Sequence, residues 1–331
     1  MDPGPDEARR GADGLRWYTG VDALWLVRDY PGSFLLARTV DRTATTIPGG
    51  TIALNDVRDS AARPGLRAWA GFGVRDHTDV ELSYFGLQNW GRTAAIRVQD
   101  PPFANSAFLG TSVPFANKSF DTTLAVRLDS EIHSAELNLR RGFALSGWNA
   151  TALVGVRYFR LSESIALTGV ETFTATTERT RTAAANNLFG AQIGTELARY
   201  WLDDRIGLSV SGKVGIFSNN ASQFTTNSTR PFGGGPGTSV LQAGRGDTDV
   251  AGLYETGITA TVRLTSRVTV RGGYQLLYVQ GLALAPDQLA LTGGAIRSFP
   301  QTPFPPGTGA RLRTDGDLLL HGPRVGLAVS Y

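Results

Sequence analysis

The sequence predicts an all-β fold, a closed antiparallel transmembrane β-barrel of about ten strands, with twelve strands as the alternative. Three observations lead to this fold class. Apolar and polar residues alternate along many segments, which is the period of a strand with two unlike faces. The connections between these segments are alternately short and long, and aromatic residues gather near both ends of the segments. No run approaches the roughly 18 apolar residues of a membrane-spanning helix, so the sequence excludes that class of membrane protein.

The strands are expected in a regular series. The first covers residues 17–28, where Val21, Ala23, Trp25 and Val27 share one face. Four hairpins follow, each with a two-residue period in both arms, at residues 66–84, 135–158, 189–216 and 255–279. The last strand, residues 324–331, ends on Tyr331 and is expected to pair with the first strand.

The connections predict which end of the barrel faces which side. Short turns are expected at residues 76–79, 142–147, 200–204 and 265–267, and long connections at 31–63, 90–122, 164–185, 218–249 and 281–316. Because the two kinds strictly alternate, short periplasmic turns would lie at one rim and long extracellular loops at the other. Residues 33–39 and 171–177 are the segments that would extend strands or add two more. The Gly- and Pro-rich stretches 233–237 and 299–307 are expected at the surface, or folded into the mouth as a lid or plug.

Composition sets further limits. The formal net charge is +3 without a basic run, so nucleic acid is not expected as a partner. Cysteine is absent, which excludes a disulfide framework and a thiolate site. Residues 1–16 are expected to form a polar, disordered segment before a barrel domain of residues 17–331. Met1 to Gly14 carry no hydrophobic export region, so a signal peptide is not expected within this chain.

The aromatic residues predict two belts on the lipid-facing side. One belt, at the short-turn rim, contains Trp17, Trp148, Trp201 and Tyr331. The other, toward the long-loop rim, contains Tyr84, Tyr158, Phe189, Tyr254 and Tyr278. Amphipathic rings are favoured at headgroup depth, so the two belts would bracket an apolar band in the outer-membrane lipid. Core anchors of a soluble β-protein are the alternative interpretation.

The opposite face of the strands is polar and carries both signs of charge. We expect the following residues to line the lumen: Arg67, Glu81, Glu136, Asn138, Arg140, Arg157, Gln192, Glu196, Lys213, Glu255, Arg263, Arg271, Gln275 and Arg324. An eight-stranded barrel is filled by its own side chains, so about ten strands predict a narrow or plugged interior. Charges that pair across the lumen are the first interpretation, because unpaired buried charge is costly. A selectivity filter is the alternative.

Several motifs resemble a known family. The motifs are SAELNLRR at residues 134–141, GVRYFRLSE at 155–163, FGAQIG at 189–194, GKV at 212–214 and GYQLLY at 273–278. In order and spacing they resemble the β-barrel porins expanded in planctomycetes, abbreviated BBP, from about Trp17 to Tyr331. The resemblance implies an outer-membrane barrel of Gram-negative type, and Glu163 is among the matching positions. The final segment also resembles the C-terminal signal of outer-membrane barrels, which implies the barrel-assembly machinery as a partner at Tyr331.

The function expected from these features is passive passage of small solutes or ions through a narrow charged lumen, without a cofactor. A structural or adhesion barrel with a plugged lumen, acting through its extracellular loops, is the alternative. A protease similar to the omptins is the third candidate, and we predict that the chain is not an enzyme. Only three His are present, and the acidic residues near His133 show no dyad spacing. The Asp-x-Asp pairs at 247/249 and 315/317 are a weak Ca²⁺ signal, so no metal site is predicted.

Overall fold

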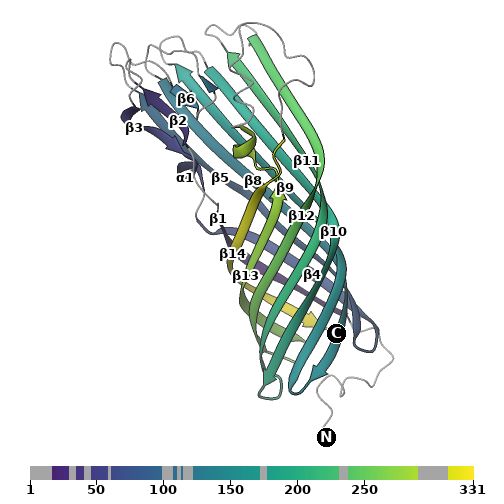
Figure 1. Cartoon of the computed structure of the whole chain (residues 1–331). Helices are drawn as coiled ribbons and strands as arrows, with labels where there is room; N and C mark the ends of the chain where they lie inside the picture. Colours follow the sequence, from purple (N-terminus) through teal and green to yellow (C-terminus); the bar gives the residue numbers. More distant parts are fainter. Residues whose placement is uncertain are drawn as a thin grey trace.

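The computed structural model describes residues 17–29, 35–40, 46–58, 61–98, 107–109, 113–114, 122–171, 177–230, 238–289 and 312–331. The predicted N-terminal segment 1–16 and the Gly- and Pro-rich stretches 233–237 and 299–307 lie outside these residues. Within them, ten antiparallel strands close into a barrel in the order β1-β14-β13-β12-β11-β10-β9-β8-β5-β4 (Figure 1). The predicted fold class and the strand number of ten are therefore confirmed, and the alternative of twelve is not needed.

The barrel strands fall into a short group and a long group. The short strands are β1 (Trp17–Asp29), β4 (Arg63–Arg75), β13 (Val268–Leu282) and β14 (Gly316–Ser330). The long strands are β5 (Thr78–Val98), β8 (Thr122–Leu145), β9 (Trp148–Glu171), β10 (Thr177–Trp201), β11 (Ile206–Arg230) and β12 (Thr238–Arg263). The first strand pairs with the last, as expected, from Tyr18 opposite Ser330 up to Asp29 opposite Leu319. This pairing removes the open edges of the sheet.

Four tight turns lie at one end of the barrel, which we call the turn end, and the C-terminus lies there too (Figure 1). They join β4 to β5, β8 to β9, β10 to β11 and β12 to β13, as predicted. Ser146 and Gly147 have φ values of 35° and 84° in the β8–β9 turn, the left-handed conformation that two-residue hairpins need. The opposite end, where the longer connections lie, is the loop end.

The predicted long connections at 90–122, 164–185 and 218–249 are wrong in extent, because strand pairing continues through residues 90–98 and through most of the other two. β9 runs on to Glu171 and β10 begins at Thr177, and β11 and β12 remain paired up to Thr229 opposite Thr238. A tilted strand needs only about 9–11 residues to cross a bilayer, whereas β9 has 24. We call the parts of β8–β12 beyond the loop-end aromatic belt the upper wall, which rises from the barrel in Figure 1.

The apolar side of the long strand β9 changes along its length. Near the turn end of β9, Val154 and Val156 face outward, and Arg157 faces the interior. Toward the loop end, the interior positions of the same strand are Phe159 and Leu161, both with no exposed surface. The outward positions there are polar. The lower barrel is thus apolar outside and polar inside, as transmembrane barrels are, and along β8 and β9 the upper wall has the opposite polarity.

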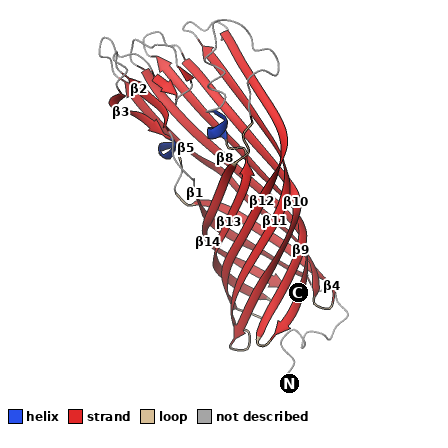
Figure 2. Cartoon of the chain, viewed as in Figure 1, coloured by secondary structure: helices blue, strands red, loops and turns tan. Residues whose placement is uncertain are grey.

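A second sheet and short helical segments lie on the inner side of the upper wall. The second sheet has the order β3-β2-β6-β7, with β2 (Leu35–Val40), β3 (Thr46–Ala53), β6 (Ala107–Leu109) and β7 (Val113–Pro114). α1 (Leu54–Val57) follows β3, and a helical turn at 285–289 follows β13 (Figure 2). Their apolar side chains form one cluster with those of β8 and β9, including Ile52, Leu54, Leu128, Ile165 and Leu289. No helix in the described part of the chain combines the length and hydrophobicity that a bilayer crossing requires.

The outer face carries the aromatic residues that the sequence assigned to two belts. At the turn end, Trp17 and Tyr331 are 50% and 72% exposed. At the other belt, Phe189 is 63% exposed, and the rings of Tyr254 and Tyr278 lie 6.0 Å apart on neighbouring strands. The remaining belt residues, which are Trp148, Trp201, Tyr84 and Tyr158, are also exposed on outward positions. Exposed rings at both ends of an apolar band are typical of a membrane interface.

Candidate functional site in the barrel interior

The structure places all fourteen predicted lumen residues on inward positions of the lower barrel. It brings twelve of them into three clusters of polar contacts. The other two, Arg263 and Gln275, face inward on β12 and β13. The clusters are described below, beginning with the central network.

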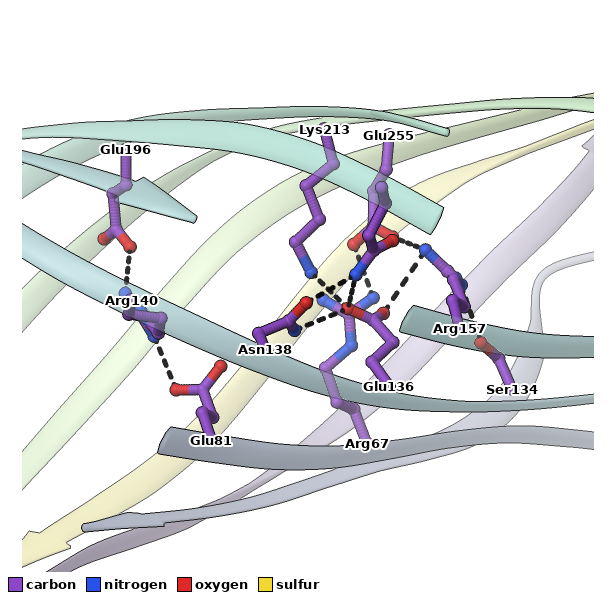
Figure 3. Close-up of polar contacts among 11 residues, drawn as sticks. Arg67, Glu81, Ser134, Glu136, Asn138, Arg140, Arg157, Glu196, Lys213 and Glu255 are labelled. Atoms are coloured by element: carbon purple, nitrogen blue, oxygen red, sulfur yellow. Dashed lines mark hydrogen bonds and ion pairs between the residues drawn. The ribbon is translucent and has the colours of Figure 1, made fainter. Parts of the chain in front are cut away.

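The central network joins strands that are not neighbours in the sheet (Figure 3). Arg157 Nη1 on β9 lies 3.2 Å from Glu136 Oε1 on β8 and 2.9 Å from Glu255 Oε2 on β12. Arg67 Nη2 on β4 donates to Glu255 Oε1 at 2.7 Å. Lys213 Nζ on β11 lies 2.8 Å from Glu136 Oε2. These ion pairs therefore cross the interior and tie opposite walls together.

Two amides complete the hydrogen bonds of this network. Gln192 Nε2 donates to Glu136 Oε2 and to Asn138 Oδ1, both at 2.8 Å. Asn138 Nδ2 donates to Glu136 Oε2 at 3.1 Å, and Arg157 Nε donates to Ser134 Oγ at 2.8 Å. Ser134 was not predicted, although it has the inward parity of Glu136. A buried ion pair holds its place only when such extra hydrogen bonds satisfy its remaining lone pairs and protons.

A second cluster centres on Arg140. Its Nη1 lies 2.5 Å from Glu81 Oε2 and its Nη2 lies 2.9 Å from Glu196 Oε2, so one guanidinium joins β5, β8 and β10. The hydroxyl of Tyr18 on β1 donates to the same Glu81 oxygen at 3.0 Å. Tyr18 was missed from sequence, although it is the only polar aromatic on the inward positions of β1.

A third cluster contains a carboxylate that sequence reasoning missed. Asp22 is fully buried on β1 and lies 3.4 Å from Arg271 Nε and 3.5 Å from Arg324 Nη1. Arg324 Nη2 also donates to Thr259 Oγ1 at 2.5 Å, and the Arg271 guanidinium lies 4.4 Å from the ring centre of Trp69. The signal for Asp22 was present, because it is the acidic residue on the inward parity of β1, opposite the apolar face of Val21.

An apolar layer closes the interior on the loop-end side of these clusters. It contains the buried residues Leu24, Leu26, Phe85, Leu87, Trp90, Ile132, Phe159, Leu161, Leu188, Phe217, Ala251, Leu253, Leu277, Val279, Leu282, Leu284, Leu318 and Leu320. Every described barrel strand except β4 contributes to it. An ion that enters this layer loses its water without gaining a polar partner, which is strongly unfavourable. Sequence reasoning missed this layer, because it expected a polar interior along the whole barrel.

The chain itself fills the mouth above the apolar layer. Residues 281–289, which we call the plug segment, follow β13 into the interior, and Ala283 and Ala285 have no exposed surface. Asn186 of β10 donates from Nδ2 to the Ala283 carbonyl at 2.8 Å and accepts from the Ala283 N–H at 2.7 Å. Asn219 of β11 donates to the Gly281 carbonyl at 2.8 Å. The barrel wall therefore recognises the backbone of this segment.

A buried ion pair lies beside the plug segment. Arg28 at the end of β1 pairs with Glu163 of β9, and both also contact Ser130 of β8. The other oxygen of Glu163 accepts from the Ala285 N–H at 3.1 Å. Burial raises the pKa of Asp287 in the same segment, while Arg313 acts in the opposite direction. Glu163 stood only among the family-matching positions, and its role in holding the segment was not visible in the sequence.

The histidines do not lie in the mouth. His77 is in the tight turn between β4 and β5, as predicted. His133 is outward on β8, where its Nε2 lies 2.7 Å from Glu131 Oε1 and its Nδ1 lies 2.6 Å from the Tyr84 hydroxyl. His321 on β14 has the same kind of neighbours, Tyr274 and Asp29. Neither of these two rings faces a cleft inside the barrel.

The carboxylates considered for Ca²⁺ make local contacts in the structure. Asp247 and Asp249 each accept a hydrogen bond from the next backbone N–H, and Thr314 also donates to Asp249. The Thr314 hydrogen bond lowers the pKa of Asp249, and the Arg313 hydrogen bond lowers that of Asp315. Among the described residues, no group of three or more His, Asp or Glu is arranged to hold a metal ion.

Comparisons with known proteins give similarity at the level of fold. The chain matches no protein-family model and no curated protein sequence. The outer membrane protease OmpT from Escherichia coli aligns with 97% of this chain and 99% of its own, at 8% identity and a TM-score of 0.45. A FadL homologue of Pseudomonas aeruginosa aligns with 96% of this chain and 90% of its own, at 10% identity and a TM-score of 0.24. The toluene transporter TodX of P. putida aligns with 99% and 92%, at 9% identity and a TM-score of 0.23.

Proposed function

We propose that this chain is an outer-membrane β-barrel whose lumen is closed to solutes and which acts as a structural or binding protein through its external end. The observation that carries the proposal is the apolar layer, in which side chains from nine of the ten barrel strands pack together inside the barrel. A ten-stranded barrel has a narrow interior, and hydrophobic constrictions stop ions by excluding water. The plug segment adds a second obstruction above it.

The location in the outer membrane is part of the same proposal. It is supported by the closed barrel, the outward apolar band and the exposed rings at both ends of that band. The tight turns would then lie on the periplasmic side and the upper wall outside the cell. The lipid of that membrane and the barrel-assembly machinery, acting at the strand that ends in Tyr331, would be its partners. Membership of the planctomycete porin family remains a prediction.

Conductance in a planar lipid bilayer tests the closed lumen. We expect the refolded protein to insert without discrete current steps, while heat-modifiable migration on a gel verifies that the barrel is folded. A variant with Phe85→Ala and Phe217→Ala removes two buried rings from the apolar layer and serves as the control that a weakened layer gives detectable current. Steps from the folded native protein would contradict the proposal.

Passive passage of small solutes or ions is the second candidate. The observation in its favour is that several charged side chains near the turn end are partly exposed inside the barrel, among them Glu196 at 32% and Arg271 at 23%. A pore would require displacement of the plug segment and hydration of the apolar layer. Native current steps whose ion selectivity changes in Arg271→Gln would favour this function over a closed barrel.

Proteolysis is the third candidate, and the expectation that the chain is not an enzyme remains a prediction. His133 lies on the outer wall with Tyr84 and Glu131, so a peptide in the mouth would not reach it. Peptide cleavage by the folded protein that is abolished in His133→Ala would favour the protease, and cleavage unaffected by this change would exclude the His133 site.

A further inference from the structure

The outside of the upper wall contains a polar hollow of about 650 Å³. Its floor consists of small side chains from β9, β10 and β11, including Ser162, Ser164, Ala183, Ala185 and Ser222. These positions have the same parity as the belt residues Tyr158, Phe189 and the lipid-facing Ile216 on their strands. The hollow therefore opens outward, on the loop-end side of the aromatic belt and not into the barrel.

The chemistry of the polar hollow is that of a neutral, hydroxyl-rich ligand. Arg127 and Arg181 balance Asp129 and Glu131 among its outward side chains. Arg127 and Asp129 already form a two-point pair at 2.7 and 2.8 Å, so the hollow has no surplus charge for a polyphosphate. Phe224 leaves 45% of its surface exposed at the edge. An aromatic face beside paired donors and acceptors suits a sugar ring, which has an apolar face and hydroxyl edges.

A second hollow of about 470 Å³ lies on the same side of the barrel, toward the turn end. Its outward side chains are mostly apolar and include Val154, Ile193, Val214, Ile216 and Tyr254, with the amide of Gln280 at its β13 edge. In the lower barrel these positions face the hydrocarbon part of the bilayer. We call this the apolar hollow, and its shape and lining suit acyl chains.

The two hollows share strands β9, β10 and β11. From Ile216 in the apolar hollow to Ser222 in the polar hollow, six residues of strand span about 20 Å. One leaflet of hydrocarbon is about 15 Å thick, with a headgroup layer of several ångströms beyond it. A single amphiphile can therefore lie along this wall with its chains in one hollow and its headgroup in the other.

We propose that the β9–β11 wall binds a glycolipid of the outer leaflet, with its acyl chains in the apolar hollow and its saccharide headgroup in the polar hollow. This inference rests on the proposed location in the outer membrane. Phe224 stacks on a sugar ring, and Arg181, which donates to Ser164 Oγ at 3.4 Å, hydrogen-bonds its hydroxyls. Ala191 borders the apolar hollow, so a larger side chain there would exclude an acyl chain.

The test uses the full-length barrel in phosphatidylcholine vesicles that contain a multiply acylated diglucosamine glycolipid. Native mass spectrometry after mild detergent extraction measures the fraction of barrels that carry the glycolipid. We expect about a tenfold loss in the Phe224→Ala, Arg181→Ala double variant, from the missing stacking and charged hydrogen bonds. Ala191→Phe should give a similar loss. Phe143→Ala and Ala152→Phe are the matched controls, because both positions are exposed outward nearer the turn end.

Two further measurements test which part of the glycolipid is recognised and whether it must be in a membrane. Phosphatidylglycerol in place of the glycolipid should be retained equally by the native protein and the Phe224→Ala, Arg181→Ala double variant, and a loss as large as that of the glycolipid would overturn the saccharide part of the inference. The deacylated saccharide, free in solution, should bind much more weakly than the intact glycolipid, and equal binding would overturn the membrane-lipid part of the inference. Equal glycolipid retention by the native protein and the double variant would overturn the site. Insertion and heat-modifiable migration are measured on the same samples, and their failure would overturn the proposed function and this inference together.

Discussion

Apolar and polar residues alternate in both halves of strand β9, but the apolar residues face outward in one half and inward in the other. Near the turn end, Val156 faces outward and Arg157 inward, and six residues later Ser162 faces outward and Leu161 inward. The direction of the side chains has not changed, so the difference lies in what surrounds each face of the sheet. The proposed membrane location puts lipid outside the lower barrel, whose interior holds paired charges. It puts water outside the upper wall, where β9 packs its inner face against a buried apolar layer, as in a soluble β-sandwich.

Placing the same charge at two neighbouring positions of the upper wall should show this difference most strongly. Leu161→Lys puts an ammonium into the apolar layer, where Leu161 has no exposed surface, and we expect a loss of roughly 5 kcal/mol or failure to fold. Ser162→Lys, one residue away on the outer face, should change the free energy of unfolding by about 0.5 kcal/mol or less. Urea unfolding in a detergent or lipid system measures both. Equal losses would mean that the upper interior is hydrated.

The interior charges of the lower barrel should be sensitive to the loss of a buried cation. Arg157→Met removes the partner that Glu136 and Glu255 share, and we expect a loss of about 3–5 kcal/mol. Adding Glu255→Gln should not restore this loss, because Lys213 still pairs with Glu136, while Arg67 would lose its pair with Glu255. Arg127→Met is the control, since its pair with Asp129 is exposed and should contribute about 1 kcal/mol or less. A single-variant loss no larger than that of the control would contradict a tightly paired interior.

The loss of stability caused by a charge on the outer face should change at the aromatic belt. Val156→Lys on the lipid-facing side of β9 should lower stability in a bilayer by roughly 2–4 kcal/mol, depending on its depth. Ser164→Lys on the same face of the same strand, beyond the belt, should have an effect near zero. Comparison of unfolding in lipid vesicles locates the bilayer boundary between these positions. Similar costs at both would place the upper wall within the membrane.

The lower barrel could be predicted from the sequence because its apolar outer face and its polar interior keep one constant alternation. The hairpins, the tight turns and the pairing of the first and last strands all follow from that pattern. The upper strands were assigned to loops because the alternation reverses near Phe159 of β9, and a pattern that changes phase resembles an irregular segment. The reversal itself is visible in the sequence at Leu161 and Ser162, once water is considered as the outer medium.

The contacts between interior side chains could be predicted only in part, for a related reason. Sequence parity tells which residues point inward, but not which of them meet across a closed ring. Glu136 and Arg157 face each other on adjacent strands, whereas Asp22 meets Arg324 only because β1 closes on β14. The contact of Glu163 with Ala285 depends on a connection that turns into the barrel, and no local pattern marks such a turn. The passage of solutes, which the sequence favoured, remains a prediction.

The plug segment offers a smaller test of how the upper interior is held. Asn186→Ala removes both hydrogen bonds to the backbone of Ala283 and leaves two buried polar groups without partners. Each such group costs about 1–3 kcal/mol, so we expect faster hydrogen exchange at residues 281–285. Asn187→Ala is the matched control, because Asn187 accepts from the Tyr158 hydroxyl on the outer face. Unchanged exchange in Asn186→Ala would mean that apolar packing alone holds the segment.

The smallest expected effect is a pH dependence of the free energy of unfolding that arises from Asp287. Burial raises the pKa of this carboxyl above its usual 3.8, although Arg313 partly offsets the effect. A raised pKa in the folded state means that ionisation of Asp287 destabilises the folded state. This destabilisation is absent in acid, where the carboxyl is protonated in both the folded and the unfolded state. It grows as pH rises from the unfolded-state pKa to the folded-state pKa, and is constant above that. Asp287→Asn should therefore be slightly more stable than the native protein at neutral pH, and the difference should vanish toward pH 3.

A variant that is less stable at neutral pH would mean that attraction to Arg313 exceeds the cost of burial, so that the ionised carboxylate helps to hold the plug segment.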